Sequence, residues 1–124
     1  MKDKRPVNLD ISTIHFPLAA ITSVLHRISG VIVFVGVAIL LWMFDMSLSS
    51  EEGFNALREC SESALFKFVV WAILSALAYH MVAGVKHLIL ESGLGETKEG
   101  VAIAAKLIVV VSALLITALG VWIW

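Results

Sequence analysis

Two long uncharged runs and a third apolar run near the C-terminus dominate the hydrophobic pattern of this chain. The uncharged runs cover residues 28–44 and 68–85. A helix rises about 1.5 Å per residue, so either run crosses most of a bilayer core of roughly 30 Å. The pattern therefore predicts an all-α membrane protein with a single domain, 1–124, and three transmembrane helices, at about 18–44, 65–89 and 101–124.

Polar segments precede and separate the predicted spans. Residues 1–17 form a short polar N-terminal arm that ends at Pro17, a residue suited to the first turn of a helix. The first loop, 45–63, contains Ser50 followed by two glutamates, which is typical of a helix start and predicts a short surface helix. The second loop, 91–100, is short and carries several glycines.

The composition supports a membrane protein and argues against several other classes. Hydrophobic residues make up 60% of the 124 residues and charged residues only 15%, whereas soluble domains are usually about 45–50% apolar. A single cysteine, Cys60, excludes an internal disulfide and a cysteine-rich metal site. The net charge of -1 and the lack of a basic stripe give no indication of nucleic-acid binding.

The distribution of lysine and arginine predicts the orientation of the chain. The N-terminal arm and the second loop lie on one side of a three-span protein, and both are richer in these residues than the first loop. Lysine and arginine are enriched on the cytoplasmic side, so we expect a cytoplasmic N-terminus and a C-terminus on the opposite side. The basic start lacks the short apolar core of a secretory signal directly after it, so we expect no cleavage.

One histidine within the second span, His80, requires a physical explanation. It lies about 9 Å from the end of the span near Lys86 and about 20 Å from the end near Lys67, embedded in the cytoplasmic half. An imidazole in hydrocarbon is costly unless it is hydrogen-bonded, hydrated or bound to a metal. His80 therefore either hydrogen-bonds a carbonyl or serine on a neighbouring helix or ligates a metal.

Four potentially cationic residues lie at one membrane level, one or two helical turns beyond His80. They are His26, Arg27, Lys86 and His87. This layout matches a b-type haem, whose iron takes an imidazole nitrogen and whose propionates bind cations. Gly84, one turn from His80 on the same face, would let a flat macrocycle approach. Taken singly, the cationic residues are more typical of interfacial anchors, and spacing alone leaves both interpretations open.

A hydroxyl and a guanidinium share one face of the first span. Ser23 and Arg27 are separated by one helical turn. Both can hydrogen-bond a carbonyl oxygen near the membrane edge, and the guanidinium would stabilise negative charge that develops there. A lipid quinone requires such polar contacts for its head and apolar room for its tail. The alternative, which the pattern does not exclude, is that Ser23 bonds only its own helix backbone.

Two motifs give the chain a family resemblance. They are Arg5-Pro6 followed by Ser23-Val-Leu-His26-Arg27-Ile-Ser29-Gly30, and His80-Met-Val-Ala-Gly84-Val-Lys86-His87. Over almost its whole length the chain resembles the cytochrome b subunit, the larger membrane anchor, of bacterial succinate dehydrogenase (succinate:quinone oxidoreductase). That family shows an R-P arm, S-x-x-H-R-x-S/T and H-x-x-x-G-x-R/K-H. The departures are mild: Lys86 stands where many members have arginine, and Glu91 where many have aspartate.

The resemblance implies a role for each of these residues. His80 would be one axial ligand of haem b, a smaller anchor subunit would supply the other, and His26, Arg27 and His87 would lie near the propionates. Ser23 and Arg27 would help to form the ubiquinone site.

The resemblance also implies a place in a larger assembly. The chain would be a membrane anchor within a hetero-oligomeric helix bundle in the bacterial inner membrane, with a periplasmic C-terminus. Its partners would be the small anchor, iron–sulfur and flavoprotein subunits of the respiratory chain and tricarboxylic acid cycle enzyme. The chain would perform no succinate chemistry of its own.

Two other interpretations compete with this one. A fumarate reductase relative or another membrane b-type cytochrome is the nearest alternative, but many of those bind two haems and need more embedded histidines. A small transporter or structural membrane subunit belongs to a different class. An intramembrane carboxylate would favour that class, and the predicted spans contain none.

Overall fold

The computed structural model describes residues 12, 15–95 and 97–124, and this part of the chain is built from α-helices. They are α1 (Leu18–Ser49), α2 (Glu51–Cys60), α3 (Ala64–Glu91) and α4 (Lys98–Ile123). Helices α1, α3 and α4 are each long and apolar enough to cross a membrane. The prediction of an all-α membrane protein with three spans is confirmed, while most of the N-terminal arm lies outside the described residues.

Hydroxyl side chains define where most of the helices begin. They accept hydrogen bonds from backbone N–H groups that a helix otherwise leaves unpaired. These bonds run from Gly53 to Ser50 (2.9 Å), from Phe66 to Ser63 (3.1 Å) and from Gly100 to Thr97 (3.0 Å). Pro17 occupies the N-cap position of α1. The short surface helix predicted after Ser50 is thus present as α2.

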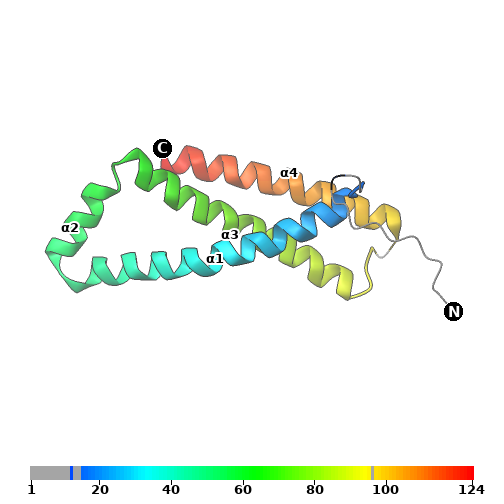
Figure 1. Ribbon diagram of the computed structural model, residues 1–124, viewed down its shortest axis with the longest axis horizontal. Helices are drawn as coiled ribbons and strands as arrows, with labels where there is room; N and C mark the ends of the chain where they lie inside the picture. The colour runs from blue at the N-terminus through cyan, green and yellow to red at the C-terminus, as the bar shows by residue number, and fades with distance from the viewer. Residues whose placement is uncertain (1–11, 13–14, 96) are drawn as a thin grey trace.

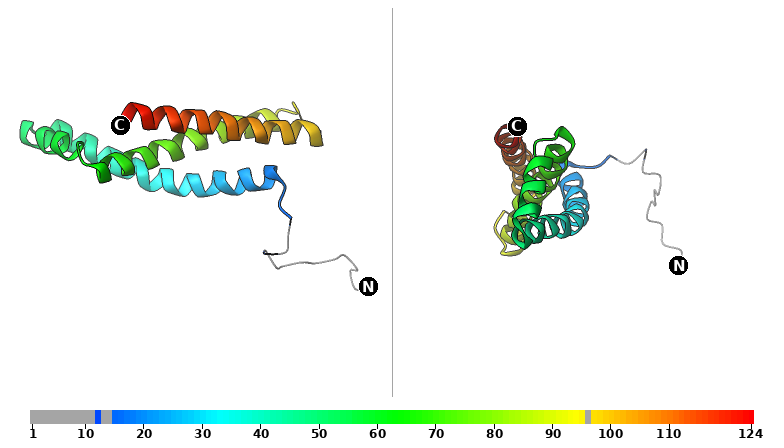
Figure 2. Two further views of the ribbon diagram at one scale, coloured as in Figure 1. Left: turned by 90° about the horizontal axis from the view of Figure 1, so that it is seen from above. Right: turned by 90° about the vertical axis from the view of Figure 1, so that its left-hand side faces the viewer.

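Helix α3 contacts both α1 and α4, and α1 and α4 also contact each other (Figures 1 and 2). Figure 1 shows α1 and α3 diverging toward the end at which α2 connects them. At the other end, the start of α1, the end of α3 and the start of α4 lie together. The turn between α3 and α4 contains Gly93 and Gly95, whose positive φ angles of 92° and 73° suit glycine.

Glycines and a tryptophan bring the spans into close contact. A β-carbon at Gly36 would lie only 2.6 Å from Cγ2 of Ile73, so the Ile73 side chain of α3 packs directly against the backbone of α1 here. Trp71 packs against Gly120 of α4 and donates its indole N–H to the carbonyl oxygen of Ile116 at 2.9 Å. Small residues and interhelical hydrogen bonds are the usual means of helix association in lipid, where no hydrophobic driving force acts between helices.

Most apolar side chains face outward. Phe34 is 82% exposed and Trp122 76% exposed. Apolar surface of this extent is stable only against lipid or against other membrane-embedded chains. Within the described part of the chain, the buried apolar side chains are Ile73, Ala83, Ala105 and Ile108.

The contact between Gly36 and Ile73 predicts that Gly36→Ala lowers the stability of the protein, although helix propensity alone would favour alanine. Alanine normally stabilises a helix over glycine by roughly 0.5–1 kcal/mol, but Gly36→Ala would force α1 and α3 apart at a cost of about 1–3 kcal/mol. We expect a lower midpoint of thermal unfolding for the variant purified in detergent.

The control is the same substitution in an Ile73→Ala background, which removes the two γ-carbons nearest to the new methyl group and leaves only the Cβ at 3.3 Å. There Gly36→Ala should destabilise much less, because most of the coupling between the two positions is lost. A higher unfolding midpoint for Gly36→Ala alone would contradict the close contact.

Candidate functional site

Three histidines from two helices gather where α1 begins and α3 ends. His26 of α1 stacks on His80 of α3, with ring centroids 4.2 Å apart and planes 8° from parallel. His87, two turns after His80 on α3, tilts against His26 with centroids 5.1 Å apart. We call His26, His80 and His87 the histidine cluster. Its geometry is tighter than the spacing predicts, because His26 contacts both other rings instead of lying level with His87 alone.

The hydrogen bonds of the embedded His80 come from α1. The hydroxyl oxygen of Ser29 lies 3.0 Å from Nδ1 of His80, and the backbone oxygen of His26 lies 3.3 Å from the same nitrogen. The Ser29 hydroxyl donates to that backbone oxygen at 2.7 Å. A serine and a carbonyl on a neighbouring helix therefore satisfy Nδ1. The other ring nitrogen, Nε2, takes part in none of these contacts, so metal ligation by His80 stays compatible with them.

A metal at His80 would need further ligands besides the His, Cys, Asp and Glu side chains that the structure describes around it. Within residues 12, 15–95 and 97–124, no group of three or more His, Cys, Asp or Glu side chains is placed to hold a metal ion. Stacking of His26 covers a face of the His80 ring, whereas a metal binds a ring nitrogen in the plane of the ring. Stacking of His26 therefore does not by itself block Nε2.

A glycine on α1 permits this contact between the helices. A β-carbon at Gly30 would lie 3.1 Å from Cε1 of His80, closer than ordinary packing allows without a shift. At Gly84 a β-carbon would lie 3.8 Å from Nε2 of His26, which is an ordinary contact. Within this chain, Gly30 is thus the glycine that lets the imidazole approach α1. The predicted role of Gly84 concerns a macrocycle and stays a prediction.

Tyr79 connects the same two helices beside the histidine cluster. Its hydroxyl donates to the backbone oxygen of Thr22 at 2.6 Å. Thr22 is 2% exposed, and its own hydroxyl donates to the backbone oxygen of Ala19 at 2.9 Å. Because the acceptor of Tyr79 is the carbonyl directly before Ser23, the phenol fixes the position of the segment that carries Ser23.

Ser23 and Arg27 occupy the start of α1, as the sequence predicts. The Ser23 hydroxyl donates to the backbone oxygen of Ala19 at 3.0 Å, which is the local bond that the pattern could not exclude. Ser23 is half-buried and Arg27 is exposed. The guanidinium is thus accessible, while the serine hydroxyl would have to rotate away from its own helix to donate elsewhere.

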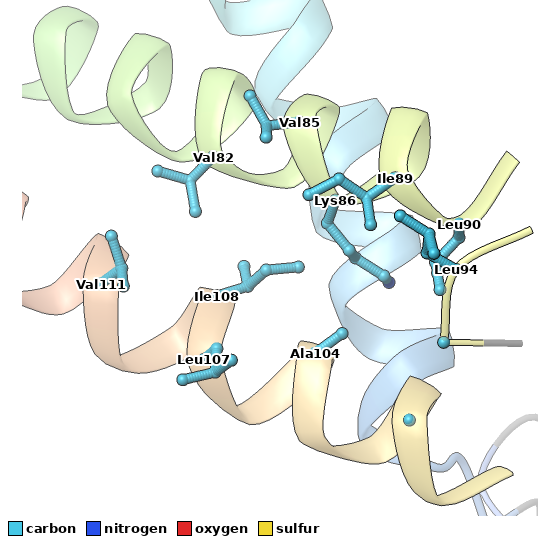
Figure 3. Close-up of a pocket in the computed structure, with 12 residues that line it drawn as sticks. Val82, Val85, Lys86, Ile89, Leu90, Leu94, Ala104, Leu107, Ile108 and Val111 are labelled. Carbon is cyan, nitrogen blue, oxygen red and sulfur yellow. The ribbon is translucent and has the colours of Figure 1, made fainter. Parts of the chain in front are cut away.

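Lys86 lies near the histidine cluster and also lines a groove between α3 and α4. It is one residue before His87, about 100° around α3, and its side chain enters an apolar groove of about 460 Å³ between α3 and α4 (Figure 3). Lys86 is buried, with 8% exposed, and it lines the groove together with Ile89 of α3 and Ile108 of α4. Burying an aliphatic stem while keeping the ammonium near the interface is typical of lysine at a membrane edge.

Comparison with known proteins gives the family. The family described as succinate dehydrogenase/fumarate reductase transmembrane subunit matches residues 1–119. The chain belongs to this family. It is 38% identical over 125 residues to the succinate dehydrogenase cytochrome b556 subunit of Coxiella burnetii, with both chains fully covered. The subunit of that name from Paracoccus denitrificans is 30% identical, over 76% of this chain and 72% of its own. The one from Rickettsia felis is 30% identical, over 91% of this chain and 88% of its own.

Membership of the succinate dehydrogenase/fumarate reductase family confirms the resemblance drawn from the two motifs. The structure adds residues to which the sequence analysis gave no role. Ser29 was part of the first motif, but only the packing of α1 on α3 brings its hydroxyl to His80. Nothing in the sequence around Tyr79 and Thr22 indicated that they join α1 to α3 through a hydrogen bond.

Tyr79→Phe tests the attachment of α1 to α3 in this family member. The change removes one interhelical hydrogen bond and leaves the ring in place, so we expect a loss of about 0.5–1.5 kcal/mol in stability. The measurement is the thermal unfolding midpoint in detergent. The matched control is Thr117→Val, which removes an exposed hydroxyl bonded only to Ala113 of its own helix. Equal midpoints for Tyr79→Phe and Thr117→Val would contradict the role of the phenol.

Proposed function

We propose that this chain is the cytochrome b anchor of a succinate dehydrogenase, that it provides one axial ligand of haem b, and that it forms part of a ubiquinone site. The observation that carries the proposal is the environment of His80, a histidine inside a membrane span whose Nδ1 is held by α1 while Nε2 makes none of those contacts. Family membership and the cytochrome b556 names of the relatives support a haem.

The chemistry of the donor set fits one side of a haem site. Haem iron accepts an imidazole nitrogen as an axial ligand, and the bound group supplies one-electron transfer. His80 would hold the iron through Nε2. The ring of His26 lies face to face against that of His80 and not across from its Nε2, so we propose that a small membrane-anchor subunit supplies the other axial ligand.

Basic side chains at the same end of the bundle suit the carboxylates of such a group. His26 and His87 belong to the histidine cluster, and Arg27 follows His26 in α1. Hydrogen bonds from cationic donors to carboxylates are roughly twice as strong as neutral ones. We therefore assign His26, Arg27 and His87 to the vicinity of the propionates.

Ser23 and Arg27 are the residues that we propose for binding quinone. The exposed guanidinium of Arg27 would donate to a quinone oxygen and stabilise negative charge as it develops there. Ser23 would rotate its hydroxyl from the Ala19 carbonyl toward the other polar atoms of the head group. This costs one local hydrogen bond, and the Ala19 carbonyl keeps its place as an acceptor in the helix.

The proposed assembly places this end of the bundle on the cytoplasmic side of the bacterial inner membrane. The excess of lysine and arginine in the N-terminal arm and second loop supports that orientation, with a periplasmic C-terminus. The histidine cluster, Ser23 and Arg27 would then face the flavoprotein and iron–sulfur subunits. The chain would bind no succinate itself, and it would anchor the subunits that oxidise it.

His80→Ala tests the ligation of haem. We expect the dithionite-reduced minus oxidised visible spectrum of membranes with the whole complex to lose or shift its haem b signal, since an axial ligand is missing. The control is His15→Ala, an exposed histidine outside the histidine cluster. A spectrum unchanged by His80→Ala would place the ligand elsewhere, and no haem b signal in the wild-type complex would overturn the cytochrome assignment.

Arg27→Leu and Ser23→Ala test the quinone site. A hydrogen bond to a charged group contributes about 1.5–3 kcal/mol, so Arg27→Leu should lower succinate:quinone activity by at least about tenfold, and Ser23→Ala by a few-fold. Succinate oxidation with an artificial acceptor that bypasses quinone should persist. Arg58→Leu in α2, at the opposite end of the bundle, should change neither activity. Full quinone activity in Arg27→Leu would contradict the assignment.

A further inference from the structure

The hydroxyl of Ser29 is the nearer of two oxygen atoms that contact Nδ1 of His80. We infer that Ser29 is a positioning residue for the haem ligand: together with the His26 backbone oxygen it favours the Nδ1–H tautomer of His80, and its own hydrogen bond orients the ring and tunes Nε2 as a ligand for iron. The inference rests on the proposed ligation of haem b by His80. It adds a role for Ser29, a residue of the first sequence motif that belongs neither to the proposed quinone site nor to the residues assigned to the propionates.

Ser29 is buried where two helices meet. Ser29 is 5% exposed, and its hydroxyl oxygen lies 3.0 Å from Nδ1 of His80 across the contact between α1 and α3. Gly30 makes this approach possible, because a β-carbon there would lie 3.1 Å from Cε1 of the imidazole. The two consecutive residues thus act together, one by making room and the other by bonding.

The direction of the hydrogen bonds follows from counting protons. A serine hydroxyl has one proton, and Ser29 donates it to the backbone oxygen of His26 at 2.7 Å. Toward His80 the hydroxyl oxygen can then only accept, so Nδ1 must carry the proton. The backbone oxygen of His26, 3.3 Å from Nδ1, has no proton to give and requires the same tautomer.

The tautomer has a chemical consequence for the other nitrogen. A neutral imidazole with its proton on Nδ1 has an unprotonated Nε2, which is the form that binds a metal. A hydrogen bond from the N–H of a metal-bound histidine also fixes the orientation of the ring and raises the basicity of the ligand. A more basic ligand favours the oxidised metal, so loss of the Ser29 contact should raise the midpoint potential of the haem.

Ser29→Ala in the complete membrane-bound complex tests the inference. We expect haem b to be retained, with a midpoint potential higher than wild type and a shifted electron paramagnetic resonance spectrum of the oxidised haem. Ser29→Thr keeps a hydroxyl and should restore the wild-type potential. The matched control is Ser112→Ala, which removes a buried α4 hydroxyl for which the described residues provide no hydrogen-bond partner. This control should leave both readouts unchanged.

The outcomes separate the inference from the proposed function. A haem signal that depends on His80 but keeps its potential and spectrum in Ser29→Ala would overturn the role of Ser29 alone. A wild-type complex without haem b would overturn the proposed ligation instead. So would a haem b signal that stays unchanged in His80→Ala. If Ser29→Ala fails to assemble, Ser29→Cys decides by the same readouts, because the thiol fills the space but is a weak hydrogen-bond acceptor.

Discussion

An imidazole placed among apolar helices must have its polar atoms hydrogen-bonded or ligated, and this requirement shapes the contact between α1 and α3. His80 meets it through Nδ1, with the Ser29 hydroxyl and the His26 backbone oxygen as partners. Both partners belong to α1, so the two helices cannot separate here without leaving polar groups unpaired in an apolar surrounding. The Tyr79 hydroxyl, bonded to the Thr22 carbonyl, repeats the same arrangement close by.

The remaining contacts between the spans depend on how closely backbones approach. Gly30 admits the imidazole, Gly36 admits Ile73, and Gly120 admits Trp71. Because the chain buries few large apolar side chains, these small residues and the interhelical hydrogen bonds carry much of the specificity of packing. Most large apolar side chains therefore remain exposed on the outer faces of the helices. This suits a subunit that packs against lipid and other membrane-embedded chains.

The residues proposed for function lie at the end of the bundle where hydrogen bonds join α1 to α3. The histidine cluster, Ser23 and Arg27 all belong to the start of α1 or the second half of α3. A proposed haem and a proposed quinone would therefore share one wall of the protein, with Arg27 adjacent to both. This proximity gives the S-x-x-H-R-x-S/T motif a physical meaning, because its serines, histidine and arginine project from a single stretch of helix.

The sequence by itself determined the three spans, the surface helix after Ser50 and the residues able to carry chemistry. It could do so because hydropathy, capping and helical periodicity are local properties that a single segment expresses alone. Only the tertiary structure decided that Ser29 meets Nδ1 of His80, that His26 stacks on His80, and that Lys86 enters the groove toward α4. Those contacts depend on the crossing and register of helices distant in sequence, which the packing of Gly30, Gly36 and Ile73 sets and no pattern within one helix encodes.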